Sequence, residues 1–421
     1  MGEVIVMKFG GTSVADAERI QRVARRIVEK RELGDSVVAV LSARGKTTDE
    51  LIAMAAEVSS TPDPREMDML LSSGERISCA LCAMAINDLG HRAISLTGSQ
   101  AGIVTDDSHT KALILDVRAE RIRAALGEDH IVLVAGFQGV SENANNVTTL
   151  GRGGSDTSAV AVAAALGARE CEIYTDVAGV YSADPRIVPD ARKLDSVSFE
   201  EMLEMAASGA GVLQLRSVEY ARNHRVRIHC RSSFDEQPGT VVLAEGETME
   251  QPLITAVTHT TAEARLTLTG VPDTPGAAAR IFEALAGANV NVDMIVQNEP
   301  VAAGGRAEIS FTVPREDLRA SCGALERLTG EAFENMSTHE EMGKVSIIGA
   351  GMRSHPGVAA KVFGVLAGEG VNIDMISTSP IKISCVIDRD RVEDAVRALH
   401  SAFELSGEGT IADEEPFRTG P

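Results

Sequence analysis

The sequence contains few aromatic residues and no tryptophan. Only 3% of its 421 residues are Phe, Trp or Tyr, whereas 44% are hydrophobic. This composition predicts a folded core of Ala, Val, Leu and Ile and excludes a disordered chain. No run of 18 apolar residues occurs and residues 1–11 lack a signal-peptide pattern, so we expect no membrane span and a cytoplasmic location.

Cysteine and positive charge are also scarce. Six scattered cysteines fit a reduced protein better than a disulfide framework. Cys79 and Cys82 have the spacing of core positions on a helix, and no second Cys or His pair accompanies them as a metal site would require. Forty basic and 61 acidic residues give a net charge of −21. This charge argues against nucleic acid and anionic membranes as partners.

Two common phosphate-binding motifs, GxxxxGK[ST] and GxGxxG, are absent. Residues 148–160 instead read TTLGRGGSDTSAV, a glycine-rich turn with Arg152, Ser155 and Asp156 that leads into an apolar helix. Glycines let backbone N–H groups approach a ligand, and a helix N-terminus favours an anion. The turn therefore suits a phosphate or a carboxylate.

Residues 1–245 alternate apolar strands with helical stretches. This order predicts an α/β domain of three αβα layers around a mostly parallel sheet. A polar hairpin is expected at Ala101–Val117. The expected strands are Glu3–Met7, Ser36–Leu41, His130–Phe137, Cys171–Thr175 and Val226–Cys230, and the expected helices are Val14–Lys30, Arg65–Leu89 and Ser155–Leu166.

An internal repeat follows a polar stretch near residue 246. Pro275–Ile295 and Pro356–Ile376 agree at 13 of 21 positions, which chance does not give. Each copy reads strand, Pro-Gly helix start, helix, turn, two strands and helix, which predicts two ferredoxin-like βαββαβ modules. We expect the α/β domain at 1–245, a linker at 246–264, modules at 265–340 and 341–405, and an acidic mobile tail at 406–421.

Several polar residues stand at expected strand or helix ends. Lys8, before Gly10 and Gly11, suits a phosphate, although a surface lysine is the alternative. Thr48 either caps a helix or binds a small substrate. Glu75 binds an ammonium group or forms a surface ion pair.

The stretch Tyr174–Arg186 (YTDVAGVYSADPR) follows another expected strand. Asp176 at the strand end suits Mg²⁺-bound water or ribose, and Arg186 offers planar donors to phosphate. The alternative is a turn at Asp184-Pro185 with a helix cap.

Together these segments resemble the aspartokinase family, whose members have an amino-acid-kinase fold followed by two ACT modules. The resemblance covers nearly the whole chain. Its motifs are KFGGTS (8–13), TTDEL (47–51), SGERIS (73–78), TGSQAG (97–102), GFQG (136–139), TLGRGGSDTSA (149–159), TDVAGVYSADPR (175–186), SFEEM (198–202) and the repeated modules.

The resemblance implies transfer of the γ-phosphoryl group of MgATP to the side-chain carboxylate of L-aspartate, the first step toward lysine, threonine and methionine. A carboxylate is already ionised at pH 7, so catalysis needs positioning and charge neutralisation rather than a general base. No direct protein ligand to the metal is implied. The implied catalytic residues are Lys8 and Asp156; those for aspartate are Thr48, Glu75, Arg152, Gly153, Gly154 and Ser155; those for the nucleotide are Lys8, Phe9, Gly10, Gly11, Ser42, Thr175, Asp176, Tyr181, Asp184 and Arg186.

The paired modules imply an amino-acid effector, lysine or threonine. Turn chemistry is the alternative explanation for the asparagines. We also expect a homo-oligomer through the modules, because they expose sheet edges. The implied effector residues are Asp273, Asn291, Asp293, Gln297, Val358, Asn372 and Asp374.

Three positions depart from the family pattern. Family members carry a lysine beside the ATP phosphates where this chain has Gly211, and Pro300 and Pro380 stand in loops near the effector, where proline removes an N–H donor. We therefore predict weakened inhibition by lysine and threonine, as for an enzyme of a specialised pathway. The alternatives are a kinase for glutamate or an N-acyl amino acid, and a regulatory paralogue without turnover.

Overall fold

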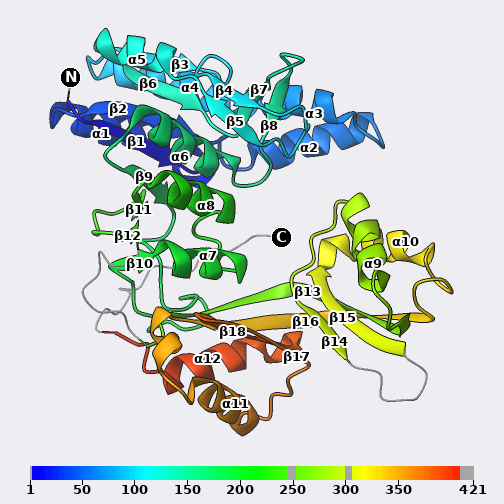
Figure 1. The fold of residues 1–421 in the computed structure, drawn as a ribbon. Helices are drawn as coiled ribbons and strands as arrows, with labels where there is room; N and C mark the ends of the chain where they lie inside the picture. Colours follow the sequence, from blue (N-terminus) through cyan, green and yellow to red (C-terminus); the bar gives the residue numbers. More distant parts are fainter. Residues whose placement is uncertain (1, 245–252, 299–305, 408–421) are drawn as a thin grey trace. The chain divides into compact units, whose positions relative to one another are not determined.

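The computed structural model describes residues 2–244, 253–298 and 306–407, which form two compact units (Figure 1). The first unit comprises Met1–Val180, Lys193–Ala207 and Gly211–Met249. The second comprises Tyr181–Arg192, Ser208–Ala210 and the chain from Glu250 onward. The short stretch Tyr181–Arg192 thus belongs to the second unit although the first unit surrounds it in sequence.

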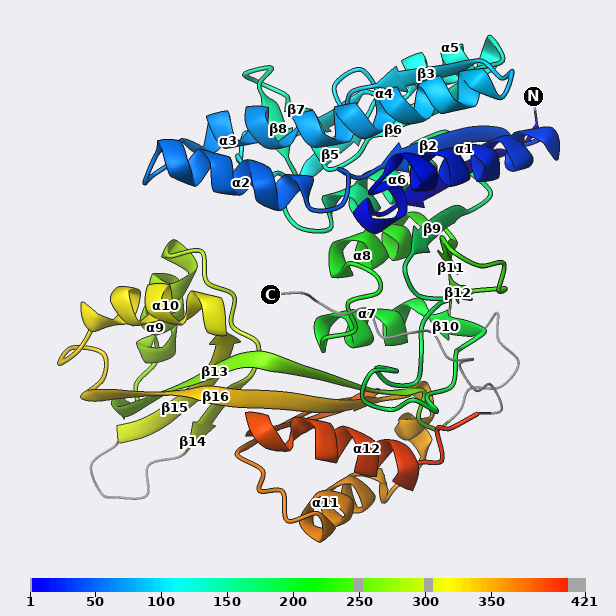
Figure 2. The same cartoon turned by 180° about the vertical axis from the view of Figure 1, so that it is seen from behind.

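An eight-stranded, mostly parallel sheet forms the centre of the first unit. Its strand order is β10-β12-β11-β9-β1-β2-β6-β3, with β11 and β12 antiparallel. Helix α6 covers one face (Figure 1), and α1 with α4 covers the other (Figure 2). This confirms the three-layer α/β fold. The strands are β1 (Val4–Phe9), β2 (Ser36–Leu41), β3 (Ala93–Leu96), β6 (Ile131–Ala135), β9 (Cys171–Thr175), β10 (Ser196–Ser198), β11 (Ile228–Ser232) and β12 (Thr240–Leu243).

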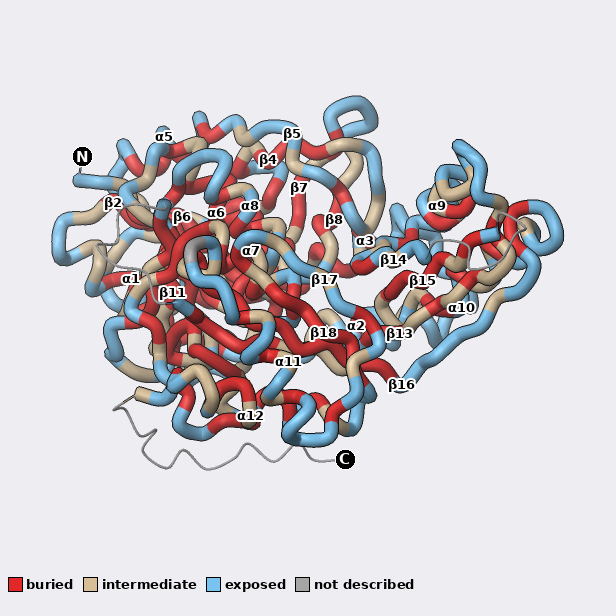
Figure 3. Tube along the Cα trace, turned by 60° about the horizontal axis from the view of Figure 1, so that its bottom comes forward, coloured by how far each residue is buried: buried red, intermediate tan, exposed pale blue. Residues whose placement is uncertain are grey.

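A helix of this unit is amphipathic where one side faces solvent, and it is apolar all round where protein covers both sides. On α1, Ile20 packs with Ile86 of α4 against alternate residues of β1, namely Ile5, Met7 and Phe9. Every residue of β2 and β6 is buried, and buried residues mark the sheet strands in Figure 3. The helices are α1 (Ala17–Glu32), α2 (Thr47–Val58), α3 (Pro64–Leu71), α4 (Ser73–Asp88), α5 (Glu120–Gly127), α6 (Gly154–Leu166), α7 (Phe199–Ala207) and α8 (Leu215–His224).

A smaller four-stranded sheet completes the first unit. Its order is β5-β4-β7-β8, and β4 pairs antiparallel with β5, as the polar hairpin at Ala101–Val117 predicts. Strand β8 ends where the glycine-rich turn begins, so this sheet carries the turn. Its strands are β4 (Ile103–Thr105), β5 (Ile114–Val117), β7 (Gln138–Ser141) and β8 (Val147–Thr149).

The single helix predicted over Arg65–Leu89 is wrong, because α3 and α4 are separate helices that meet at Ser72. The Gln138 side chain donates a 2.9 Å hydrogen bond to the Ser72 carbonyl, which offers that carbonyl a partner outside the helix. Together Pro64–Asp88 are long and apolar enough to cross a membrane. However, 50% of the most apolar window is buried inside the unit, as in the core helix of a globular domain.

The second unit contains one six-stranded sheet of order β14-β15-β13-β16-β18-β17. Its two central strands are long, and each pairs along its length with the other. Helices α9 and α10 belong to the first repeat copy, and α11 and α12 to the second. The elements are β13 (Ala256–Pro272), α9 (Ala277–Gly287), β14 (Ile295–Asn298), β15 (Arg306–Pro314), α10 (Leu318–Glu326), β16 (Asn335–Ile348), α11 (Val358–Gly368), β17 (Met375–Ser379), β18 (Lys382–Asp388) and α12 (Val392–Ala402).

Each long central strand serves both copies, so the strand that completes the second copy precedes the first copy in sequence. Residues 263–272 of β13 pair with β15 in the first copy. Residues 256–260 pair with residues 344–348 of β16, and there they supply the last strand of the second copy. The predicted linker 246–264 is therefore strand from Ala256 onward. Residues 246–252 of that linker and 408–421 of the predicted tail lie outside the described residues.

Candidate active site

The candidate active site of the first unit lies at the carboxyl edge of its parallel sheet. Neighbouring strands end together there: the Ser42 N–H donates to the Phe9 carbonyl at 3.1 Å, and the Gly10 N–H donates to the Tyr174 carbonyl at 3.3 Å. The Gly136 N–H likewise donates to Leu41 of β2. Ligands of open α/β sheets bind outside this edge.

Lys8 and Asp156 form a close ion pair at this edge. Lys8 is near the end of β1, and Asp156 is in the first turn of α6. Lys8 Nζ lies 2.6 Å from Asp156 Oδ1, and the two side chains are 12% and 9% exposed. Because the pair is largely out of water, Asp156 holds the ammonium group in one place.

Of the two glycines after β1, Gly11 is required by its surroundings, and Gly10 leaves room beside Lys8. A Cβ placed on Gly11 would lie 2.8 Å from the Ala43 carbonyl oxygen, and one on Gly10 would lie 3.5 Å from Lys8 Nζ. Gly136 is equally confined, at 2.9 Å from the Ser155 side chain. Small residues thus keep the space beside the Lys8 ammonium open, as phosphate groups require.

Glu75 is a buried carboxylate with an unpaired oxygen. It is 3% exposed, and its Oε1 accepts a hydrogen bond from the Ala43 N–H at 3.1 Å. Among the described residues, Oε2 has no hydrogen-bond partner. Burial raises the pKa of Glu75 to about 7, although hydrogen bonds to backbone N–H groups oppose this. A buried, unpaired carboxylate suits an incoming ammonium group.

Packing explains the glycine in the middle of the predicted helix at residues 65–89. A Cβ on Gly74 would lie 2.8 Å from the Ala43 Cβ and 3.5 Å from the Thr47 side chain. The first turn of α4 therefore touches the loop after β2, and this contact brings Glu75 to the sheet edge.

The glycine-rich turn has the predicted geometry. Gly151 and Gly153 have φ of 78° and 72°, which favour glycine. Helix α6 begins at Gly154, and Ser155 and Asp156 are buried in its first turn, whereas Arg152 is exposed. The N-terminus of α6 and the Lys8 ammonium thus lie in the same part of the unit.

The remaining predicted residues of the first unit are near strand ends or a helix start. Thr48 is half-buried in the first turn of α2, and Lys46 is the N-cap residue, so Thr48 is not the cap that the alternative interpretation suggested. Ser42 follows β2 directly. Thr175 ends β9 and donates a hydrogen bond to the exposed Asp176 at 3.0 Å.

Tyr181, Asp184 and Arg186 fall in the second unit. The Asp184 carboxylate accepts the Arg186 N–H at 2.9 Å and its guanidinium at 2.7 Å. Burial raises the pKa of Asp184, but these hydrogen bonds outweigh it and lower the pKa overall. Their nucleotide role stays a prediction.

Two of the predicted effector residues are engaged in ion pairs between the repeat copies. Asp293 of the first copy contacts Lys344 of the second copy's first strand. Asp374 of the second copy lies 2.8 Å from Arg265 of the first copy's first strand. Arg265 and Lys344 occupy matching repeat positions, so the two pairs are reciprocal. Asn372 adds a 3.3 Å hydrogen bond to Asp374.

The other effector positions are mostly on the surface. Val358 and Pro380 line one cavity of about 430 Å³ in the second copy. Pro300 lies outside the described residues. Asp273, Asn291 and Gln297 are exposed.

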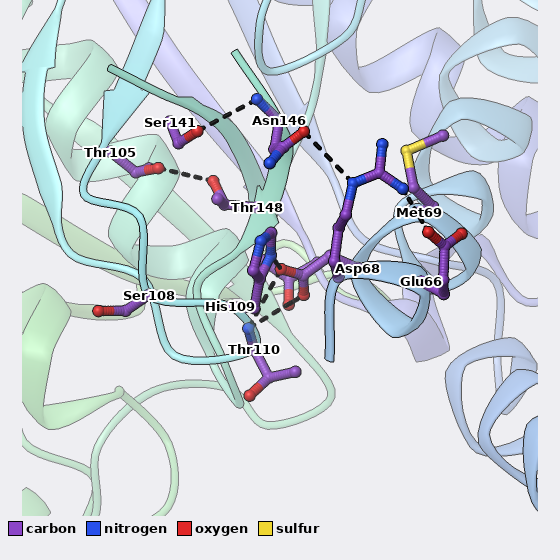
Figure 4. A network of polar contacts seen from close by, with 12 residues as sticks. Glu66, Asp68, Met69, Thr105, Ser108, His109, Thr110, Ser141, Asn146 and Thr148 are labelled. Carbon is purple, nitrogen blue, oxygen red and sulfur yellow. Dashed lines mark hydrogen bonds and ion pairs between the residues drawn. The ribbon is translucent and has the colours of Figure 1, made fainter. Parts of the chain in front are cut away.

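Asp68 is a buried residue that the sequence analysis does not single out, and its carboxylate faces His109 and Thr110 (Figure 4). Its partners are 41, 42 and 81 residues away along the chain. Its one sequence signal is an acidic residue within an apolar helix.

A model of the amino acid kinase family matches residues 3–232, and a model of the ACT domain matches residues 266–328 and 345–403. The aspartokinase of Mycolicibacterium smegmatis is 56% identical over 408 residues, covering 96% of this chain and 97% of that protein. The chain belongs to the aspartokinase family. The aspartokinase of Corynebacterium glutamicum is 52% identical over 96% of this chain and 97% of its own length.

Solved structures of aspartokinases share this fold. Aspartokinase III of E. coli, crystallised with aspartate and ADP, has a TM-score of 0.81 and 28% identity, covering 95% of this chain and 99% of its own. The same enzyme with lysine and aspartate has a TM-score of 0.73 over 96% of this chain and 100% of its own.

Proposed function

We propose that this aspartokinase transfers the γ-phosphoryl group of ATP to the side-chain carboxylate of L-aspartate, giving 4-phospho-L-aspartate. The observation that carries the proposal is the buried Lys8–Asp156 pair among glycine turns at the sheet edge. The ammonium of Lys8 neutralises negative charge on the transferring group, and Asp156 fixes its position. Such preorganised charge is the main source of catalysis in phosphoryl transfer.

The acceptor requires groups for its ammonium and its α-carboxylate. Glu75 offers a buried carboxylate oxygen to the ammonium, and the exposed Arg152 offers a planar pair of donors to the α-carboxylate. Thr48, Gly153, Gly154 and Ser155 complete this proposed subsite. A free amino acid therefore fits better than an N-acyl amino acid, whose nitrogen carries no charge.

The nucleotide is proposed to bind with Mg²⁺, which shields the phosphates and orients them. Phe9, Gly10, Gly11 and Ser42 lie beside Lys8 in this scheme. Thr175 and Asp176 stand at the adjacent end of β9, and an acidic group there suits metal-bound water.

Trapping the acyl phosphate with hydroxylamine, together with an ADP-release assay, tests the proposal. We expect one hydroxamate per ADP with L-aspartate, and no product with L-glutamate or N-acetyl-L-aspartate. Turnover of N-acetyl-L-aspartate would contradict the role of Glu75. ATP binding without turnover of any acceptor would instead indicate a regulatory paralogue.

The second unit is proposed to bind lysine or threonine and to pair with a second copy of the chain. Support comes from the reciprocal Asp293 and Asp374 ion pairs, because an effector ammonium would compete with Lys344 or Arg265 for these carboxylates. Pro380 in the cavity wall removes one N–H donor, so we expect weakened inhibition. Full inhibition by sub-millimolar lysine or threonine would refute that expectation.

A further inference from the structure

Asp68 of α3 is a buried carboxylate saturated with hydrogen bonds. It is 0% exposed. Its Oδ2 lies 2.6 Å from His109 Nδ1, and its Oδ1 accepts from the Thr110 N–H at 3.1 Å and from the Thr149 hydroxyl at 2.5 Å. Figure 4 shows the carboxylate of Asp68 facing His109 and Thr110 from the helix.

These partners come from two segments, a loop and the end of a strand. His109 and Thr110 are in the loop between β4 and β5, and Thr149 is the last residue of β8. Thr110 has φ of 66°, which is unfavourable for a β-branched residue. The Asp68 carboxylate holds this strained backbone through its N–H. Backbone strain that persists under such constraint is concentrated at functional sites.

Thr149 connects the carboxylate to the glycine-rich turn. It is followed directly by Leu150, Gly151 and Arg152. The Thr149 carbonyl accepts from the Ala112 N–H at 2.9 Å, so both its side chain and its backbone are fixed. A Cβ on Gly151 would lie 3.2 Å from the Thr110 carbonyl oxygen, which places the strained loop against the turn.

A third contact holds the turn from α8. Arg216 Nη1 donates to the Leu150 carbonyl at 2.7 Å, and its Nη2 donates to the Ala112 carbonyl at 3.0 Å. Burial lowers the pKa of this guanidinium, so the site bears a desolvation cost here too. Two charged side chains, Asp68 of α3 and Arg216 of α8, thus hydrogen-bond to residues at the start of one short turn.

Stability alone does not explain this arrangement. A buried charge with its hydrogen bonds adds little or nothing to stability relative to well-packed apolar residues. Hydrogen bonds to a carboxylate do, however, impose direction on the groups that donate them. The carboxylate of Asp68 therefore fixes the position of the start of the turn and adds little to the free energy of unfolding.

We propose that Asp68 is a positioning residue for the acceptor amino acid, acting through Thr149 on the turn that carries Arg152. This inference rests on the proposed role of Arg152 in binding the acceptor. Thr149 is three residues from Arg152, whereas Lys8 is held by Asp156 of α6. Loss of Asp68 is therefore expected to raise KM for aspartate more than it disturbs the groups around Lys8.

Two adjacent threonines provide a matched test in the full-length enzyme. Thr148 and Thr149 are both 0% exposed, but Thr148 pairs with the Thr105 hydroxyl at 2.6 Å and not with Asp68. We expect Thr149→Val to raise KM for aspartate about tenfold, the loss of a hydrogen bond to a charged group. The kcat and KM for ATP stay within about twofold, as for removal of uniform binding. Thr149→Ser, which keeps the hydroxyl, restores the wild-type KM.

Thr148→Val is expected to lower the thermal midpoint while leaving KM for aspartate unchanged. Asp68→Asn is the second variant, and it is expected to raise KM for aspartate at least as much as Thr149→Val. Either variant that folds, as judged by its thermal midpoint, decides the question. A normal KM in that variant, or an equal rise in Thr148→Val, would overturn the proposal.

Separate results would refute the proposed function and the proposed role of Asp68. If wild type gives no phosphoaspartate, or Arg152→Ala leaves KM for aspartate unchanged, the role of the turn itself is refuted whatever Thr149 does. If Arg152→Ala raises KM but neither Thr149→Val nor Asp68→Asn does, the function stands and the role of Asp68 is refuted.

Discussion

Single buried charges are central to the chemistry proposed for the first unit. Lys8 and Glu75 each carry a charge that the fold removes from water but leaves available on one side. Lys30 provides a contrast, because its Nζ lies 2.7 Å from the buried Glu172 in an ion pair away from the glycine turns. Lys8 and Glu75 are therefore the charges proposed to bind substrate, and Lys30 is a charge that pairs within the fold.

We expect Lys8→Ala to lower kcat by about 10²–10³-fold, because removing a charge-stabilising group costs roughly 2–4 kcal/mol of transition-state stabilisation. Steady-state kinetics with aspartate measure this. Lys30→Ala is the matched control, which we expect to lower the thermal midpoint and keep kcat. An unchanged kcat in Lys8→Ala would exclude its role.

The raised pKa of Glu75 predicts pH dependence of aspartate binding. Below its pKa of about 7 the free enzyme carries a neutral Glu75, which attracts an ammonium group poorly. KM for aspartate is therefore expected to rise as pH falls from 8 to 6 by about tenfold per unit below the pKa. Glu75→Gln removes this dependence and keeps KM high throughout, whereas Glu172→Gln leaves it intact. A flat wild-type profile would contradict the assignment.

The same shift affects stability in the ligand-free enzyme. Because the folded-state pKa is raised, Glu75 contributes stability at low pH that is lost as pH rises through about 7. Aspartate at neutral pH should reverse this loss by pairing with the carboxylate.

A substitution at Gly211 tests whether the lysine that family members carry at this position affects ATP binding. A Cβ there meets no atom within 4 Å, and the residue is exposed. Gly211→Lys is thus tolerated by the fold, and we expect it to lower KM for ATP about threefold to tenfold if the position faces phosphate. Gly211→Ala controls for the lost glycine. No difference between the two variants would show that the departure has no effect.

Individual site residues differ in whether a sequence pattern can predict them. Lys8 and Gly11 were recognisable because their motif is continuous along the chain. Asp68 was not, because its three partners come from distant segments and only the folded β-sheet brings them together.

At the scale of elements, strand β13 packs into two cores. Val257 belongs to the core of the second copy with Val345 and Leu399, and Leu268 belongs to that of the first copy with Phe311. The repeat predicted the helices and strands within each copy. It could not predict that residues 256–260 supply the last strand of the second copy, because these residues precede the repeat and resemble any short strand.

Two truncations on this one strand test whether it serves both copies. We expect Val257→Ala and Leu268→Ala each to cost about 2–4 kcal/mol, as for large-to-small changes in a core. Hydrogen exchange should then rise in α12 for Val257→Ala and in α10 for Leu268→Ala. Faster exchange in α10 for Val257→Ala would mean that the first half of β13 supports the neighbouring copy instead.

At the scale of the whole molecule, two compact units predict two unfolding transitions. Calorimetry is expected to resolve them, because separate units violate two-state behaviour. ADP and aspartate, each at about 100 times its Kd, should each stabilise the first unit by roughly 2.7 kcal/mol. The midpoint of the first unit should therefore rise more than that of the second. Lys8→Ala should reduce the shift. One transition that moves as a whole would show that the units unfold together.

The stretch Tyr181–Arg192 constrains how this enzyme can be shortened or recombined. Its apolar residues Ile187, Val188 and Ala191 are at most 9% exposed, and their packing partners belong to the second unit. A chain cut near residue 245 would keep these side chains but lose their cover, which favours aggregation. A chimera that exchanges the second unit between relatives must therefore transfer this internal stretch with it, although the stretch lies within the kinase part of the sequence.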